Sequence, residues 1–149
     1  MQIEPVGVVR SPVVDEVDAD WGNVVSTIEV VPRLAEGLDG LDGFSHLVVI
    51  FWMHRSSFDP VRDLRRRPRG RADMPLLGIF AQRAKHRPNP IGVTAVRLLQ
   101  VEGNVVRVHG LDAIDGTLVL DLKPYAPAFD QPLEPVVSEW FERLMEGYF

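Results

Sequence analysis

Side chains that could bind a ligand or take part in a reaction are concentrated in a stiff, charged segment, GIFAQRAKHRPNPIGVT, at residues 78–94. Its hydrogen-bond donors and positive charges are Arg83, Lys85, Arg87 and Asn89. Two prolines, Pro88 and Pro90, fix their own φ angles and restrain the residues before them. A stiff loop loses little entropy when a ligand docks on it, so the segment is predicted to face an anionic ligand or partner. The alternative is a rigid turn that merely carries surface charge.

A second polar segment, HGLDAIDGTLVLDLKPY, lies at residues 109–125. Asp112 and Asp115 bracket a tight turn that Gly116 closes, and such aspartates often hydrogen-bond only their own backbone. Further along stand Asp121, Lys123 and Tyr125. If the neighbouring strands close into a barrel, these carboxylates and the phenol are expected to emerge at converging strand ends and to meet the proline-rich loop.

The charge of the chain is unevenly distributed. The formal net charge is −5, which argues against a general nucleic-acid binder. Between Arg55 and Arg87, however, ten Lys or Arg residues accompany only three acids, so this segment carries +7 and the rest of the chain −12. The asymmetry predicts a localised anion-facing surface, and the alternative is a solvated arginine loop.

Several other kinds of site are disfavoured. The chain has no cysteine, which excludes disulfides, thiolate nucleophiles and cysteine metal sites. Its four histidines are scattered, without HxH or HExxH spacing, so no metal site is predicted. The N-terminal residues lack the features of a signal peptide, and the apolar run LVVIFWM is too short to span a bilayer. A cytoplasmic protein without membrane contact is therefore expected.

The elements that must position these side chains are mostly strands. β-branched or alternating runs predict strands at residues 6–11, 24–31, 45–54, 76–81, 91–103, 104–111 and 117–125. The run at 24–31 presents Val24, Ser26, Ile28 and Val30 as its core face, whereas the run at 45–54 is expected to be covered on both sides. No βαβ pattern appears, which disfavours a parallel sheet. About seven short strands therefore predict a mainly β fold, namely a small closed antiparallel β-barrel.

Two further segments complete the predicted fold, which is expected to be one domain, 1–149. Residues 56–74 are rich in Arg and Pro and lack periodicity, as expected for a long loop that is either functional or disordered. Near the end of the sequence, Val137, Trp140, Phe141 and Leu144 form the apolar stripe of a C-terminal helix. Pro135 suits its first turn and Gly147 suits its end. The stripe is predicted to be a lid on the core or a dimer contact.

Four segments together carry a family resemblance: GVVRSP, GLDGFSHLVVIFWMH, GIFAQRAKHRPNPIG and GLDAIDGTLVLDLKPY. In this order they resemble the YaeB/TrmO (TsaA-like) family of small β-barrel methyltransferases. The resemblance implies S-adenosyl-L-methionine as cofactor, a homodimer, and N6-methylation of (threonylcarbamoyl)adenosine at position 37 in the anticodon loop of tRNA. It leaves open the same barrel methylating another substrate, such as a small molecule, or a non-enzymatic barrel that binds RNA or a nucleoside.

Matched positions in the family imply roles for individual residues. The implied cofactor-binding residues are His54, Arg55, Arg83, Val93, Leu111 and Asp112. The family commonly has Thr-Arg-Ser where this chain has Gln82, Arg83 and Ala84, so a hydroxyl is missing on each side of the arginine. The better-known bacterial tRNA enzymes of the family carry a second small domain, which leaves the RNA substrate more open here than the cofactor.

The implied reaction suggests bases and RNA contacts. N6 of adenine is a poor nucleophile, and a threonylcarbamoyl group makes its N–H more acidic, so a general base would help without being obligatory. Their place in the DG…KPY pattern makes Asp115 and Tyr125 the candidate bases. The predicted RNA-binding side chains are Arg65, Arg66, Arg67, Lys85, Arg87, Asn89 and Lys123. If these residues contact RNA phosphates, the affinity for RNA is predicted to fall steeply as the salt concentration rises.

Overall fold

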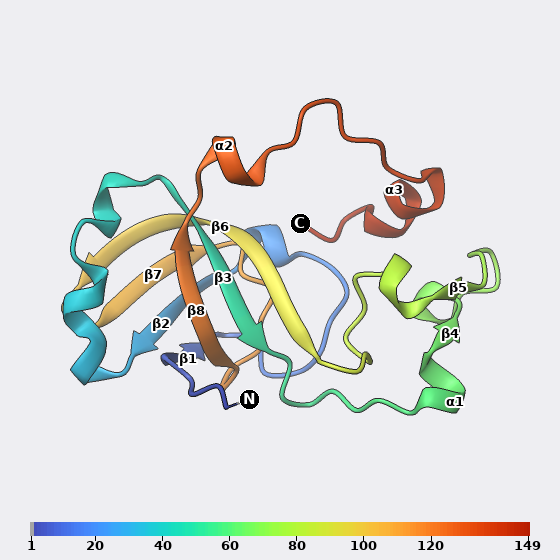
Figure 1. Cartoon of the computed structure of the whole chain (residues 1–149), viewed down its shortest axis with the longest axis horizontal. Coiled ribbons are helices and arrows are strands. Elements are labelled where there is room, and N and C mark those ends of the chain that lie inside the picture. The colour runs from blue at the N-terminus through green and yellow to red at the C-terminus, as the bar shows by residue number, and fades with distance from the viewer. Residues whose placement is uncertain (1) are drawn as a thin grey trace.

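The computed structural model describes residues 2–149 and contains a closed antiparallel barrel of six strands (Figure 1). Around the barrel the strands follow the order β1, β2, β7, β6, β3, β8. Their bounds are β1 Gly7–Arg10, β2 Val25–Val30, β3 His46–Trp52, β6 Ile91–Glu102, β7 Val105–His109 and β8 Leu118–Pro124. The predicted mainly β barrel is confirmed. The expected strand at 76–81 lies outside it, because only Leu77–Gly78 is extended (β5) and it pairs with Arg65–Arg66 (β4).

Alternation along each strand builds the barrel core. On β2 the inward residues are Ser26, Ile28 and Val30, so the core face predicted for this strand is confirmed over the residues that form it. On β3 only Leu47, Val49 and Phe51 are buried, and the residues between them are half-buried or exposed. The expectation that β3 is covered on both sides is therefore wrong, because a strand in a small barrel buries only its inner face. Each fully buried Val or Leu contributes about 1.5–3 kcal/mol to folding.

The long hairpin of β6 and β7 turns at the sequence EGN, residues 102–104. Gly103 adopts a φ of 58°, a left-handed conformation that glycine takes without steric cost. Asn104 then joins the hairpin to β2, because its side-chain Nδ2 donates to the carbonyl of Val30 at 2.7 Å. The turn therefore helps to close the barrel as well as reverse the chain.

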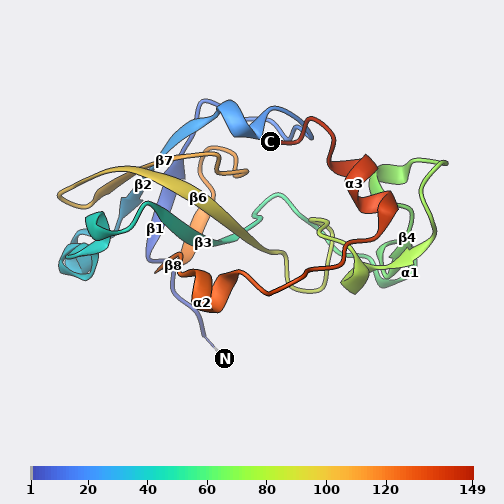
Figure 2. The same ribbon diagram turned by 90° about the horizontal axis from the view of Figure 1, so that it is seen from above.

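Residues 59–81, here called the arginine arm, project beyond the ends of β3 and β6 (Figures 1 and 2). The arm contains α1 Pro60–Asp63, β4, η4 Pro68–Gly70, β5 and η5 Ile79–Ala81. It has a small core of its own, in which Met74 and Ile79 are at most 1% exposed. The segment predicted as a structureless loop is thus a compact unit made of very short elements, whose lengths are below what sequence periodicity can reveal.

A buried carboxylate organises the arm. Asp63 accepts hydrogen bonds from the backbone N–H of Asp59 at 2.9 Å and from Nε and Nη2 of Arg62 at 2.9 and 2.8 Å. Arg66 approaches the same carboxylate at 3.6 Å. These hydrogen bonds, above all that of Arg62, hold the pKa of Asp63 well below its usual range. Part of the arginine-rich sequence therefore serves the folding of the arm.

Short helices connect and cover the strands. Three 3-10 helices, η1 Trp21–Asn23, η2 Pro32–Leu38 and η3 Leu41–Gly43, lie on the N-terminal side of β3, and α2 Pro127–Asp130 follows β8. The C-terminal helix is confirmed as α3 Glu139–Met145, but it starts after Ser138 and not at Pro135. Gly147 follows it with a φ of 69°, as its predicted role at the helix end requires. None of the helices within residues 2–149 has the length and hydrophobicity needed to cross a membrane.

The final residues turn back toward the barrel (Figure 2). In this C-terminal tail, residues 146–149, the carbonyls of Gly147 and Tyr148 accept hydrogen bonds from the backbone N–H groups of Asp20 and Trp21 at 3.0 and 2.9 Å. The helix and tail therefore bridge from the arginine arm to the open end of the barrel.

Candidate functional site

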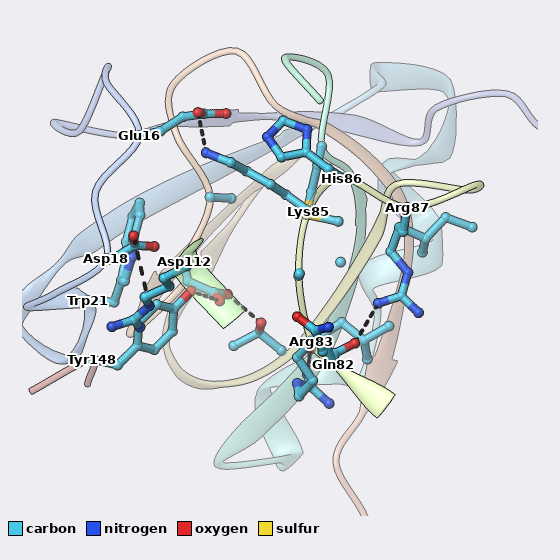
Figure 3. Close-up of a pocket in the computed structure, with 18 of the residues that line it drawn as sticks. Glu16, Asp18, Trp21, Gln82, Arg83, Lys85, His86, Arg87, Asp112 and Tyr148 are labelled. Carbon is cyan, nitrogen blue, oxygen red and sulfur yellow. Dashed lines mark hydrogen bonds and ion pairs between the residues drawn. The ribbon is translucent and has the colours of Figure 1, made fainter. Parts of the chain in front are cut away.

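A cavity with a volume of about 1130 Å³ opens where the barrel end, the arginine arm and the C-terminal segment meet. Its walls come from residues distant in sequence, among them Asp18, Trp21, Arg69, Phe80, Arg83, Val93, Asp112, Trp140 and Tyr148 (Figure 3). The volume suits a ligand of nucleotide size, and the walls mix aromatic faces with a few charged groups, as ligand sites usually do.

The proline-rich loop is held against the end of β3 by close packing. A Cβ atom at Gly92 would lie 2.3 Å from the ring of Phe51, so only glycine permits this approach. The carbonyl of Pro90 accepts a hydrogen bond from the backbone N–H of Met53 at 2.8 Å. These contacts set the direction in which β6 leaves the loop, and they place Val93 at the cavity wall.

Two of the predicted cofactor residues meet there directly. Arg83 Nη2 donates to the carbonyl of Val93 at 2.5 Å, so the guanidinium is fixed at the rim of the cavity. Arg83 keeps its other donors for a ligand, since a guanidinium carries five N–H groups. The predicted association of the loop with the cavity is supported by this geometry.

Asp112 is the most constrained carboxylate of the cavity. It follows β7 and accepts one hydrogen bond on each oxygen: Thr94 Oγ1 donates to Oδ1, and Tyr148 Oη donates to Oδ2 at 2.7 Å. Its sequence neighbour Leu111 is completely buried in the barrel core and does not line the cavity. Of these two predicted cofactor residues, only Asp112 directs its side chain to the site.

The remaining predicted cofactor residues, His54 and Arg55, also line the cavity. His54 Nδ1 lies 3.4 Å from Thr117 Oγ1, and Arg55 approaches Asp15 at 3.7 Å. The segment after them is tied to the proline-rich loop, because Ser56 Oγ donates to the carbonyl of Lys85. The two segments that the resemblance assigns to the cofactor therefore lie side by side.

Gln82 connects the loop to the arginine arm. Its Nε2 donates to the carbonyls of Arg66 and Leu77 at 2.9 and 3.0 Å, and its side chain is 5% exposed. Its own carbonyl accepts from Arg87 Nη1 at 3.1 Å. The glutamine that departs from the family pattern thus anchors the arm, a role that a threonine at this position would be too short to fill in the same way.

The predicted RNA-binding residues occupy several different environments. Arg66, Lys85, Arg87 and Asn89 line the cavity, and Lys85 forms an ion pair with Glu16. Arg65 is exposed on the arm, whereas Arg67 Nη1 donates to the carbonyl of Met74. Lys123 lies elsewhere, on β8, paired with Asp121 at 2.7 Å.

The two candidate bases do not line the cavity. Asp115 Oδ1 accepts a hydrogen bond from the backbone N–H of Ser11 at 3.1 Å, a long-range contact and not the bonding to its own turn considered from the sequence. Tyr125 lies at the other end of β3 from the proline-rich loop, where its ring is 6.2 Å from that of His46. The expected meeting of this phenol with the loop is wrong, because β8 runs antiparallel to β3 and carries Tyr125 away from it.

Sequence reasoning missed Tyr148 as a cavity residue. Burial, together with the negative charge and hydrogen bond of Asp112, raises the pKa of the Tyr148 phenol well above its usual range. The phenol therefore stays protonated and acts as a donor. The apolar stripe of α3 also reaches the site, because Trp140, Phe141 and Leu144 line the cavity. For Tyr148, the only sequence signal was the aromatic pair, Tyr148 and Phe149, directly after Gly147.

No group of three or more potential metal ligands occurs among residues 2–149. The carboxylates of the cavity are instead engaged by cations or hydroxyls: Glu16 by Lys85, Asp18 by Arg69, and Asp112 by two hydroxyls. Its chemistry is that of a site for an organic ligand with both polar and aromatic parts.

Comparisons with known proteins identify relatives of the chain. Residues 18–131 match the model of the tRNA-methyltransferase O N-terminal domain. A relative from Pyrococcus abyssi, named "Probable S-adenosyl-L-methionine-binding protein", is 38% identical over 149 residues, which cover 93% of this chain and 75% of the relative. A Mus musculus protein named tRNA (adenine(37)-N6)-methyltransferase is 41% identical over 95 residues, 64% of this chain and 22% of its own length.

Among solved structures, TrmO from Pseudomonas aeruginosa matches with a TM-score of 0.75 at 31% identity and covers 93% of this chain. The chain spans 61% of the length of that protein. The shared barrel and the match to the family model over most of the sequence lead to one conclusion: the chain belongs to the TrmO family of tRNA-methyltransferase O N-terminal domains.

Proposed function

We propose that the chain is an S-adenosylmethionine-dependent methyltransferase that acts on N6 of the adenosine at position 37 of tRNA. The observation that carries the proposal is the cavity in which Arg83, Val93 and Asp112 come together beside a basic arm. Relatives named for S-adenosylmethionine binding and for tRNA adenine methylation support the cofactor and the substrate, respectively.

The residues present fit this cofactor. S-adenosylmethionine carries an ammonium group, ribose hydroxyls, a carboxylate and an adenine ring, and when bound it supplies an electrophilic methyl group. Asp112 offers acceptor lone pairs for an ammonium or hydroxyl donor, and Arg83 offers free N–H groups for a carboxylate. Aromatic walls such as Trp21 and Phe80 suit a purine ring.

The protein contributes mainly by holding two reactants in line. Methyl transfer from a sulfonium is a displacement, so alignment of the attacking nitrogen with the methyl group supplies much of the rate. Each carboxylate in the cavity wall is already engaged: Glu16 by Lys85, Asp18 by Arg69, and Asp112 by two hydroxyls. Carboxylates so engaged do not over-stabilise the cationic ground state, which would slow the transfer.

This arrangement supports a reaction without an obligatory general base. The finer substrate we propose is adenosine that already bears an N6-threonylcarbamoyl group, whose urea-like N–H loses its proton more readily. The proposal does not depend on Asp115 or Tyr125 as a base, since neither side chain lines the cavity. Asp115→Asn is expected to retain turnover, because its carboxylate accepts a hydrogen bond from the backbone N–H of Ser11.

The arginine arm is the proposed contact for the anticodon loop. Arg62 and Arg66 share Asp63, and Arg71 pairs with Asp73 at 2.7 Å. Arg65, by contrast, is exposed and carries no ion pair within residues 2–149, so it is free for a phosphate. Single-stranded loops with splayed bases suit a surface of this kind beside a deep cavity.

We also propose a homodimer. The segment formed by α2 and the residues after it exposes apolar side chains to an unusual degree: Phe129 is 90%, Leu133 94% and Val136 97% exposed. Apolar side chains gathered in this way mark an interaction surface. A second copy of the chain would cover them, and light scattering at increasing protein concentration measures its presence.

Mass spectrometry of tRNA nucleosides from cells with and without this protein tests the proposed reaction. The expected result is loss of an N6-methylated adenosine derivative in the deleted strain and its return with the wild-type gene. In parallel, calorimetry with S-adenosylmethionine tests the cofactor. Cofactor binding with unchanged tRNA nucleosides would overturn the tRNA substrate and favour another methyl acceptor, whereas absence of heat would overturn the methyltransferase.

A further inference from the structure

Tyr148 joins three parts of the molecule at the edge of the cavity. Its hydroxyl donates to Asp112 of the barrel at 2.7 Å, and the guanidinium of Arg69 from the arm lies 5.6 Å from the centre of its ring. Its own backbone carbonyl accepts from Trp21 N–H at 2.9 Å. Figure 3 shows Tyr148 and Asp112 pointing toward one another in the cavity.

Asp112 is held from both sides. Thr94, on strand β6, donates to one carboxylate oxygen, and Tyr148 donates to the other. Each carboxylate oxygen accepts more than one hydrogen bond, so a ligand can still bind without displacing either hydroxyl. Without the tyrosine hydroxyl, only the hydrogen bond from Thr94 would hold the carboxylate. The second oxygen could then change its orientation.

The position of Tyr148 is itself built by close contacts. Gly147 accepts a hydrogen bond from Asp20, and a Cβ atom at Gly22 would lie 2.4 Å from the backbone carbon of Phe149. The tail therefore fits a surface that only glycine at position 22 leaves open. It is an ordered wall of the site.

Arg69 reaches Tyr148 from an uncommon backbone conformation. Its φ is 51°, in the left-handed region that side chains other than glycine rarely adopt. The guanidinium also lies 3.9 Å from Asp18, which lines the same cavity. Such strain persists where the surrounding contacts hold it, and here they direct one arginine of the arm inward.

We propose that Tyr148 is a positioning residue for the cofactor, orienting the Asp112 carboxylate and linking that orientation, through Arg69, to the seating of the arginine arm. This inference rests on the proposed binding of S-adenosylmethionine in the cavity. If the link holds, binding of the cofactor and binding of an RNA on the arm are coupled, and each changes the affinity for the other by the same factor. The phenol suits this task because it stays protonated, so its donation to Asp112 persists at neutral and mildly alkaline pH.

Calorimetry of S-adenosylmethionine binding to three full-chain variants tests the link. Tyr148→Phe keeps the ring and removes the hydroxyl, and it is expected to weaken binding by about tenfold, as for one hydrogen bond to a charged group. Arg69→Gln is expected to weaken it by about threefold, although Arg69 belongs to the arm. Tyr125→Phe is the matched control, since the chain has only these two tyrosines, and it is expected to bind as the wild type does.

A double-mutant cycle separates positioning from general packing. In an Asp112→Asn background, Tyr148→Phe is expected to weaken binding by less than about twofold further, because its partner has lost its charge. If Asp112→Asn does not fold, Thr94→Val serves as the second background, in which Tyr148→Phe should cost more than in the wild type. The melting temperature of Tyr148→Phe is expected to stay close to that of the wild type, because its ring packing is kept.

Fluorine NMR provides a signature that a merely structural residue would not show. With 3-fluorotyrosine incorporated, the resonance that Tyr148→Phe removes is expected to shift on addition of S-adenosylmethionine, and the Tyr125 resonance to stay in place. Equal cofactor affinity of Tyr148→Phe and wild type, or additive losses in the cycle, would overturn the inference while leaving the proposed function intact. A wild type that does not bind the cofactor would overturn both.

Discussion

Gly92 shows how much the site depends on the absence of a side chain. Gly92→Ala places a methyl group 2.3 Å from the Phe51 ring, so the ring or the proline-rich loop must move. The expected destabilisation is about 1–3 kcal/mol, typical of overpacking a core. Thermal unfolding measures it, and Gly78→Ala is the matched control, because a Cβ there meets nothing within 4 Å and its φ is −64°. Equal melting temperatures of the two variants would contradict the packing argument.

Tyr148 also predicts how the protein responds to alkaline pH. Its folded-state pKa lies above the unfolded value of about 10, so the neutral phenol is favoured by the fold. The stabilisation is therefore fully present below about pH 10 and is lost as the pH rises beyond that value. Chemical unfolding at pH 8 to 11 is expected to show a steeper fall for the wild type than for Tyr148→Phe. Parallel pH profiles of the two proteins would be the opposite result.

At the scale of elements, the arginine arm depends on one buried carboxylate. Asp63→Asn loses the charge that Arg62 and Arg66 share, so the arm is expected to open locally while the barrel remains folded. Trypsin would then cleave after Arg65 or Arg66 several-fold faster than in the wild type. Asp73→Asn, which alters an exposed pair, should leave the cleavage rate nearly unchanged. Cleavage distributed evenly over arm and barrel would show global unfolding instead.

Acid is expected to have the same local effect. Because the pKa of Asp63 is lowered in the folded arm, its contribution to stability is present above the unfolded value of about 4. That contribution is lost as the pH falls below about 4 toward the folded pKa. Hydrogen exchange at pH 3 and pH 5, corrected for the intrinsic rates, measures this effect. The protection of the arm amides relative to the barrel amides is expected to be lower at pH 3 than at pH 5. An arm that stays as protected as the barrel at pH 3 would contradict this role for Asp63.

For the whole molecule, the uneven charge predicts a strong salt dependence of tRNA binding. An acidic protein that binds an anion through one basic surface relies on release of counterions from the phosphates. Arg65→Ala, in the arm, is expected to weaken binding and reduce the slope of log affinity against log salt by about one. Arg107→Ala, which removes an exposed arginine of barrel strand β7, is the control and should change neither. Affinity that is independent of salt would contradict an RNA contact through the arm.

The sequence by itself determined the local pattern of the barrel. Alternating runs located all six barrel strands to within one or two residues, because an inward-outward period of two is a property of neighbouring residues. The family resemblance of the motifs at 78–94 and 109–125 implied that Arg83, Val93 and Asp112 belong to the same site. Only the tertiary structure decided which strand ends meet. It places Tyr125, from the motif at 109–125, at the opposite end of β3 from the proline-rich loop that it was expected to meet.

The contacts that sequence reasoning missed act across long separations. Tyr148 bonds Asp112 from 36 residues away, and Gln82 reaches Arg66 across 16. No local pattern encodes such pairs, because they form only after the barrel has closed and the arm and tail have folded back onto its end. The chemical character of the loop could thus be predicted from its residues. The shape of the cavity, and the contact between Tyr148 and its carboxylate, depend on the packing of three segments that are distant in sequence.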